Sequence, residues 1–185
     1  AGMAEYNVIG TAKHFPGHGD TATDSHYGLP KVDKSLDELM EVELKPYEVA
    51  IDQGIEMIMT AHILYPQLES DKIVSNKTGE AESLPATMSD DILTGLLKEQ
   101  MGFEGIIVTD AMNMAGIADT WDQVQSVIIA INAGVDLFCM PCRLYCQADL
   151  QNLDAIINGV IAAVESGEIP MERIDDAVTR ILTVK

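Results

Sequence analysis

Titratable side chains are unusually dense in one short segment, residues 13–26, with the sequence KHFPGHGDTATDSH. It holds three of the four histidines of the chain together with a lysine and two aspartates. An apolar run, Val8–Ala12, precedes it, and glycines and a proline interrupt it. This pattern is typical of a short buried strand that ends in a polar loop. Such a loop at the end of a strand is where catalytic and binding residues concentrate, so residues 13–26 are the first candidate site.

Within this segment, Asp24 and His26 are separated by a single residue. In an extended segment both side chains lie on the same side. A carboxylate that accepts a hydrogen bond from one ring nitrogen fixes the histidine tautomer, which makes the ring a positioned proton donor and acceptor near neutral pH. An Asx turn with a surface histidine would have the same spacing, so both interpretations remain open.

A second candidate is Asp110, which directly follows the apolar and β-branched run Ile106–Thr109. An aspartate at the carboxyl end of a strand can act as a nucleophile, a base or a metal ligand. The alternative is that it caps a helix that begins at Ala111.

The two remaining histidines have different contexts. His18 lies between Gly17 and Gly19 and is predicted to brace the loop. His62 follows a second apolar run, and it either faces a ligand or is hydrogen-bonded in the core. No H-E-x-x-H spacing is present, which disfavours a zinc hydrolase.

The cysteines Cys139, Cys142 and Cys146 have C-x2-C-x3-C spacing. Thiolates could hold zinc or an iron–sulfur cluster, but no fourth cysteine follows and no histidine is near in sequence. We interpret them as incidental and predict no metal site. No G-x-G-x-x-G motif follows any apolar run, so no dinucleotide or other cofactor is predicted.

Four predicted strands alternate with helices along the chain. A capping-box pattern at Ser35 and Glu38 predicts a helix over 36–53 that Pro46 kinks or splits. The predicted strands are 8–12, 55–60, 106–109 and 135–140, and further helices are expected at 90–101, 121–133, 150–165 and 170–183. The polar stretch 67–82 has no periodicity and is expected to be a loop.

This order predicts an α/β fold with a parallel sheet, because nearly continuous apolar strands are typical of strands buried on both faces. Each predicted strand is followed by a polar residue at its carboxyl end, which is where α/β folds place their sites. Four βα units equal half of a (β/α)8 barrel. An open doubly wound sheet has the same alternation, and periodicity does not decide between them.

The composition disfavours several classes of partner. The 185 residues include 30 acidic and 11 basic side chains, for a formal net charge of -19. Nucleic acids and anionic membranes require a basic face, so neither is predicted as a partner. No apolar stretch is long enough for a membrane span and no signal peptide is visible, although the start at Ala1-Gly2-Met3 suggests a truncated chain.

Several motifs together resemble one family. KHFPGHG-x4-DSH at 13–26 resembles the signature loop of glycoside hydrolase family 3 β-N-acetylglucosaminidases, also called β-hexosaminidases. LPATMS at 84–89 and GFEGIIVTDAMNM at 102–114 resemble later segments of the same family. AGVDLFCMP at 133–141 and RIDDAVTRIL at 173–182 resemble the end of its barrel.

The resemblance implies a TIM barrel of which residues 1–185 form a single partial catalytic domain, the C-terminal half with about strands 5–8. It implies that Asp110 is the nucleophile, that His26 is the general acid/base paired with Asp24, and that Lys13 and His14 bind sugar hydroxyls. His18 and His62 are then expected in structural or supporting roles. A histidine would stand where glycosidases usually have a second carboxylate.

The expected function is removal of terminal β-linked N-acetylglucosamine from oligosaccharides or cell-wall fragments, with retention of configuration by double displacement. One alternative is phosphorolysis, because a neutral base repels an anionic acceptor less than a carboxylate does. Another is a non-catalytic, carbohydrate-binding half barrel. The expected partners are the sugar substrate and another half barrel, either a second copy or a missing N-terminal segment. The compartment stays open, since the family occurs both in the cytoplasm and at the cell surface.

Overall fold

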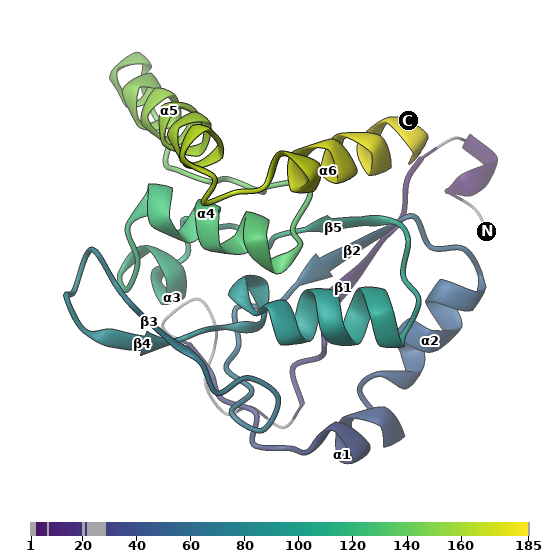
Figure 1. Ribbon diagram of the computed structural model, residues 1–185. Coiled ribbons are helices and arrows are strands. Elements are labelled where there is room, and N and C mark those ends of the chain that lie inside the picture. Colours follow the sequence, from purple (N-terminus) through teal and green to yellow (C-terminus); the bar gives the residue numbers. More distant parts are fainter. Residues whose placement is uncertain (1–2, 7, 20, 22–28, 185) are drawn as a thin grey trace.

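A three-stranded parallel sheet with the order β1–β2–β5 forms the centre of the computed structural model, which describes residues 1–185 except 1–2, 7, 20, 22–28 and 185 (Figure 1). The strands are β1 (Thr11–Phe15), β2 (Met57–Thr60) and β5 (Ile106–Val108), and a short 3-10 turn, η1 (Ala4–Tyr6), precedes them. The predicted α/β fold with parallel strands is therefore confirmed.

The first strand begins later than predicted. Val8 and Ile9, expected inside a buried strand, are exposed, and β1 begins at Thr11. Burial also alternates along β1 and β2, whereas only β5 is buried at every residue. Strand β1 is at the edge of the described sheet, which accounts for its exposed residues, whereas β2 and β5 each have a neighbouring segment on both sides.

The fourth predicted strand, 135–140, is reduced to a single parallel bridge between Val108 and Leu137. Backbone hydrogen bonds extend this pairing with β5 slightly. The N–H groups of Asp136 and Leu137 donate to Ile107 O, and the N–H group of Thr109 donates to Leu137 O. The segment occupies the position of a strand next to β5, but Met140 at φ 45° and Pro141 end the extended backbone early.

Local signals decide where the helices begin and end. The Ser35–Glu38 capping box is present, and it starts α1 (Leu36–Glu41). Pro46 splits the predicted helix, since α2 (Lys45–Asp52) begins as a separate helix with Pro46 in its first turn. The break between them, residues 42–44, turns Glu43 toward the interior, where its side chain is mostly buried.

The polar stretch after β2 contains more structure than predicted. Two three-residue strands, β3 (Lys72–Val74) and β4 (Ala81–Ser83), pair there as an antiparallel hairpin. Three-residue strands are too short for periodicity to reveal them. The chain then enters a 3-10 turn, η2 (Ala86–Met88), and a wide π-type helix, η3 (Asp91–Gln100), whose first turn is capped by the hydroxyl of Ser89, which accepts from Ile92 N–H.

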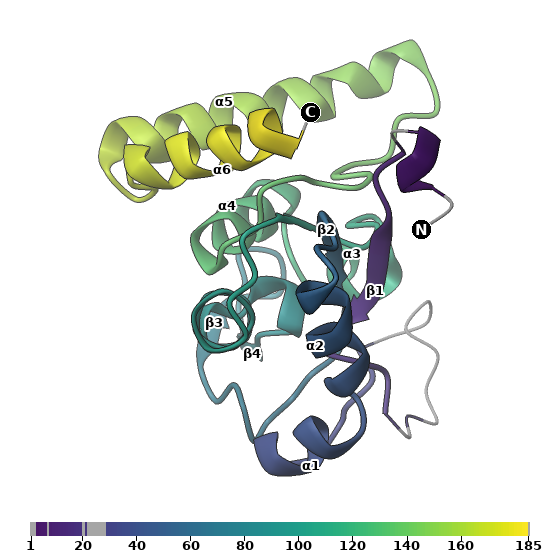
Figure 2. The ribbon, with the colours of Figure 1, turned by 90° about the vertical axis from the view of Figure 1, so that its right-hand side faces the viewer.

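The second half of the chain is mostly helical. It contains, in order, α3 (Ala115–Ala118), α4 (Gln123–Ala133), η4 (Gln147–Asp149), α5 (Leu150–Ser166) and α6 (Met171–Val184). Helix α5 packs on α4 and projects from the body, whereas α6 runs along β5 (Figures 1 and 2). Among the described elements, none is a helix long and apolar enough to cross a membrane.

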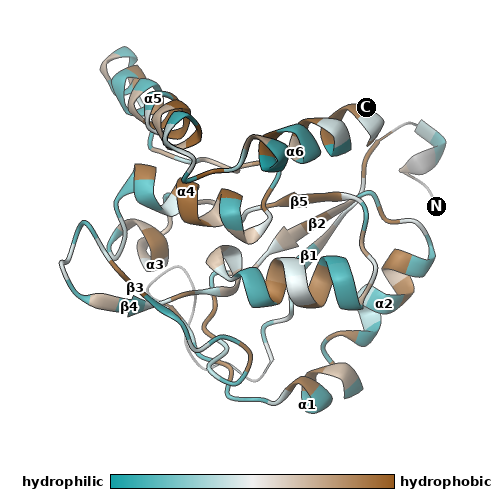
Figure 3. Ribbon diagram, in the orientation of Figure 1, coloured by the Kyte–Doolittle hydropathy of each residue, from teal (hydrophilic) through white to brown (hydrophobic). Residues whose placement is uncertain are grey.

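The main core lies between the sheet and its helices, with a smaller cluster between α4 and α5. Apolar residues colour β5 and much of α4, whereas α6 carries both hydrophilic and hydrophobic residues (Figure 3). An ion network fastens α6 to the body. Arg173 of α6 pairs with the fully buried carboxylate of Asp136 and donates to the carbonyls of Ile131 and Val135.

Candidate active site

Two of the predicted site residues meet at the carboxyl ends of β1 and β5. His14 Nε2 lies 3.4 Å from Asp110 Oδ2, although the two residues are 96 positions apart in sequence. Both side chains keep about a fifth of their surface exposed, 23% for His14 and 22% for Asp110. Parallel pairing through β2 brings these strand ends together, so the sheet itself assembles the contact.

One carboxylate oxygen of Asp110 is held by a backbone hydrogen bond, and the other faces His14. Its Oδ1 accepts a hydrogen bond of 2.8 Å from Ala111 N–H, which leaves Oδ2 facing His14. The alternative of a helix N-cap does not describe it, because the next helix, α3, begins only at Ala115 with Met114 as its cap. A carboxylate fixed at one oxygen presents the other in a defined direction, as a nucleophile requires.

His62 is buried, and both of its ring nitrogens are hydrogen-bonded inside the protein. Nε2 lies 3.2 Å from Ala111 O, and Nδ1 lies 2.8 Å from Thr87 Oγ1. Because a carbonyl oxygen only accepts, Nε2 carries the proton in this arrangement. The structure thus places His62 in the core, with protein partners at both ring nitrogens.

Burial lowers the pKa of His62, although the hydrogen bond to Ala111 and the charge of Asp110 partly oppose this effect. The ring is therefore neutral at pH 7. It holds the carbonyl of the residue that directly follows Asp110, and so contributes to the position of that carboxylate.

The remaining described residues of the histidine segment surround this contact. Lys13 is exposed on β1, and the ring of His18 meets that of His14 edge to face, with centroids 5.4 Å apart. The peptide bonds Lys13–His14 and Phe15–Pro16 are both cis. A cavity of about 480 Å³ is lined by Ala12, Lys13, His14, Gly17, His18, Glu43, Pro46 and Tyr47. The other predicted members of the site, Asp24 and His26, lie outside the described residues.

Sequence reasoning missed three residues that support the site. Thr87 bonds to His62, to Thr60 and to Ala61 O. Tyr65 donates from its hydroxyl to Gly17 O, and Glu43 lies beneath the same turn. Thr87 belongs to the LPATMS segment, whose only signal in the sequence is its resemblance to the family. No spacing signal marks Tyr65 or Glu43, because their partners are distant in sequence.

The cysteines form no disulfide, and they differ in environment: Cys142 is buried and Cys146 is exposed. Within the described ranges, no three His, Cys, Asp or Glu side chains come together in a way that could hold a metal ion.

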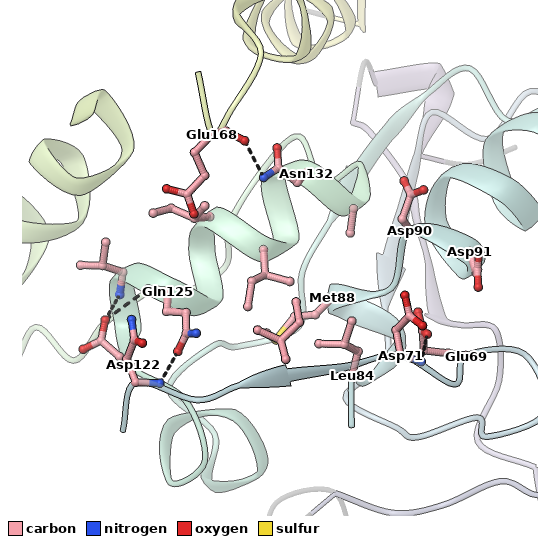
Figure 4. A pocket seen from close by; sticks show the side chains of 16 residues that line it. Glu69, Asp71, Leu84, Met88, Asp90, Asp91, Asp122, Gln125, Asn132 and Glu168 are labelled. Atoms are coloured by element: carbon pink, nitrogen blue, oxygen red, sulfur yellow. Dashed lines mark hydrogen bonds between the residues drawn. The ribbon is translucent and has the colours of Figure 1, made fainter. Parts of the chain in front are cut away.

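A larger cavity, about 800 Å³, lies elsewhere, between α4, η3 and the β3–β4 hairpin (Figure 4). Six carboxylates line it, and neither Asp110 nor any histidine that the structure describes does. These carboxylates are Glu69, Asp71, Asp90, Asp91, Asp122 and Glu168. Several already have protein partners: Glu69 accepts from Ser89, and Asp122 caps α4. The predicted site residues His14 and Asp110 therefore lie at the strand ends and do not line this larger cavity.

Comparison with known proteins places these features in one family. The family model described as the glycosyl hydrolase family 3 N terminal domain matches residues 1–184. The chain is 41% identical to beta-hexosaminidase A of Pseudoalteromonas piscicida over 179 residues, which is 96% of this chain and 30% of the relative.

Solved structures agree with this match. A glycoside hydrolase family 3 beta-N-acetylglucosaminidase from Paenibacillus sp. str. FPU-7 superimposes with a TM-score of 0.86 at 38% identity, over 100% of this chain and 32% of that one. A beta-glucoside phosphorylase, BglX, bound to 2FGlc, superimposes with a TM-score of 0.83 at 29% identity, over 100% of this chain and 31% of that one. The chain thus spans about a third of the length of these relatives.

Proposed function

Because the chain belongs to glycoside hydrolase family 3, we propose that the protein removes terminal β-linked N-acetylglucosamine by a retaining double displacement. One observation carries the proposal: His14 and Asp110 meet at the carboxyl ends of two parallel strands, and the Asp110 side chain keeps about a fifth of its surface exposed there. The names of the similar hexosaminidases from Pseudoalteromonas and Paenibacillus support the choice of sugar.

In the first step, we assign Asp110 Oδ2 the attack on the anomeric carbon. The bond from this carbon to the leaving oxygen breaks while His26 donates a proton to that oxygen. In the second step, His26 takes a proton from water, the water oxygen attacks the anomeric carbon, and the bond to Asp110 breaks. Asp24 would hold the tautomer of His26, and Lys13 and His14 would hold sugar hydroxyls.

Removal of the Asp110 carboxylate tests the role of this residue. We expect Asp110→Ala in the full-length protein to reduce turnover of an aryl β-N-acetylglucosaminide by at least about 10³-fold, since the covalent step loses its nucleophile. Undiminished turnover would exclude Asp110 as nucleophile. Sugar binding without turnover by the unmodified protein would instead favour the non-catalytic carbohydrate-binding alternative.

Phosphorolysis is the second candidate, and the similarity to a solved beta-glucoside phosphorylase favours it. A neutral histidine base repels an anionic acceptor less than a carboxylate does, and Lys13 lines the cavity of about 480 Å³ together with His14. The two reactions differ in product. A rate that rises with phosphate, together with formation of a sugar 1-phosphate, would assign phosphorolysis, whereas a phosphate-independent rate with free sugar as product assigns hydrolysis.

We also propose that further βα units complete the sheet on the side of β1. In the described sheet β1 is the edge strand, and the exposed apolar side chains of Val8 and Ile9 precede it. An unpaired edge with adjacent apolar surface favours association with another strand. The units would come from a second copy of the chain or from another part of a longer protein, and together they would form a TIM barrel.

A further inference from the structure

Glu43 is a buried carboxylate to which the proposed reaction assigns no role. It lies in the break between α1 and α2, and its side chain is only 9% exposed. Its Oε1 pairs with Lys34 Nζ at 2.6 Å. The other oxygen, Oε2, is buried and has no hydrogen-bond partner among the residues that the structure describes. A buried polar atom without a partner costs free energy, so the position of this side chain calls for a reason beyond the ion pair.

The side chain lies directly beneath the turn that carries His18. A Cβ atom added to Gly17 would lie 2.9 Å from Glu43 Cβ, and one added to Gly19 would lie 3.6 Å from Glu43 Oε1. Gly17 has a φ of 130°, which L side chains rarely adopt. Only glycine therefore allows the backbone to rest on Glu43 this closely. The hydroxyl of Tyr65 holds the same turn through Gly17 O, so the turn is fixed at two points.

This turn is linked to the reactive carboxylate through two rings. Glu43, Gly17, His18 and His14 line the same cavity of about 480 Å³. The rings of His18 and His14 are in edge-to-face contact, and His14 meets Asp110 at 3.4 Å. A displacement of the turn would therefore move the imidazole that faces Asp110.

We propose that Glu43 is a positioning residue of the site, whose side chain supports the Gly17–Gly19 turn and thereby fixes His18 and His14 beside Asp110. The effect on catalysis rests on the proposed glycosidase function, whereas the effect on the histidines does not. Because catalysis is sensitive to displacements of about 1 Å, loss of this support should lower the rate without any loss of a reacting group.

The test compares two substitutions of Glu43 in the full-length protein. Glu43→Ala removes the side chain beyond Cβ, including the Cγ and Oε1 atoms that lie beside Gly17 and Gly19, and Glu43→Gln keeps its size and shape. We expect Glu43→Ala to lower kcat/KM for an aryl β-N-acetylglucosaminide by at least about tenfold, and Glu43→Gln to stay within about threefold of the unmodified protein. The ring resonances of His14 and His18 should shift in Glu43→Ala and stay close to their original positions in Glu43→Gln.

The matched control is Glu69→Ala. Glu69 is also a buried carboxylate, but it accepts hydrogen bonds from Ser89 and from Asp71 N–H away from the histidines. This variant should lose stability while the His14 and His18 resonances and kcat/KM change little. If the Glu43→Ala protein does not fold, Gly17→Ala provides the second variant, because its Cβ pushes the turn away from an intact Glu43.

The proposal is overturned if Glu43→Ala, or Gly17→Ala in its place, leaves the resonances of both histidines and kcat/KM unchanged. It is also overturned if Glu43→Gln loses as much activity as Glu43→Ala, since that would assign the effect to charge and not to support. A full-length protein without any turnover would instead contradict the proposed function, and the resonances of His14 and His18 would still test the role of Glu43.

Discussion

At the scale of single residues, the site depends on which groups are fixed and which are left accessible. Asp110 has one oxygen bound to Ala111 N–H and the other directed at His14. The ring of His62 is hydrogen-bonded to the carbonyl of Ala111 through Nε2 and to the Thr87 hydroxyl through Nδ1. The buried, hydrogen-bonded side chain of His62 thus helps to orient the partly exposed carboxylate of Asp110, which is the arrangement expected of a preorganised site.

The lowered pKa of His62 predicts a pH dependence of stability. An unfolded histidine binds a proton near pH 6.5, whereas the folded ring does so only at lower pH. The free energy of unfolding should therefore fall as the pH decreases from about 6.5 toward the lowered pKa of the folded state, and this contribution should be fully present above pH 6.5.

Thermal unfolding of the unmodified protein and of His62→Gln between pH 5.5 and 7.5 measures this dependence. The variant should be less stable by about 1–3 kcal/mol at pH 7.5, because buried partners lose hydrogen bonds. Its stability should also depend less on pH than that of the unmodified protein. Equal slopes in the two proteins would contradict a buried, neutral His62.

At the scale of elements, close packing of α5 on α4 gives a second prediction. A Cβ atom added to Gly159 of α5 would lie 2.2 Å from Val124 Cγ1, so Gly159→Ala forces the helices apart. We expect a loss of about 1–3 kcal/mol in the free energy of unfolding, measured by urea denaturation. Val124→Ala should restore part of this loss in the double variant.

The matched control is Gly95→Ala in η3, where the nearest atom to an added Cβ is Asp90 O at 3.9 Å. This substitution should be neutral or stabilise by up to about 1 kcal/mol, because it removes backbone freedom from the unfolded chain without a clash. Similar losses in both variants would mean that the α4–α5 contact is not as close as described.

The elements also show what the sequence could predict and what it could not. The Ser35–Glu38 capping box, the split at Pro46 and the apolar strands β2 and β5 were predictable, because each depends on neighbouring residues. The β3–β4 hairpin and the short α3 were not, since segments of three or four residues carry too little periodicity.

The same distinction applies to the site. Asp110 and His14 could be proposed from their places at strand ends, but the contact between them depends on the parallel order of β1, β2 and β5. Glu43, Tyr65 and Thr87 were not predictable as supporting residues, because their partners Gly17 and His62 lie 25 or more positions away in sequence. Tertiary packing alone creates these pairs.

At the scale of the whole molecule, the proposed completion of the sheet predicts association. The described sheet has β1 at its edge, and the apolar residues Val8 and Ile9 before it are exposed. We expect the 185-residue chain to elute as a dimer or larger species, with its mass measured by light scattering, or to bind the dye ANS as a monomer. Ile9→Lys should weaken the association. A stable monomer that binds no dye would contradict this proposal.

The central claim is that Asp110 forms a covalent bond to the sugar, and trapping that intermediate tests it most directly. A fluorinated aryl β-N-acetylglucosaminide that glycosylates the enzyme quickly and is released slowly should add one sugar to the full-length protein. Mass spectrometry of the digested protein should then locate the added mass on Asp110, within the peptide that follows β5. Labelling of another carboxylate, or turnover with inversion and no labelled protein, would contradict the assignment.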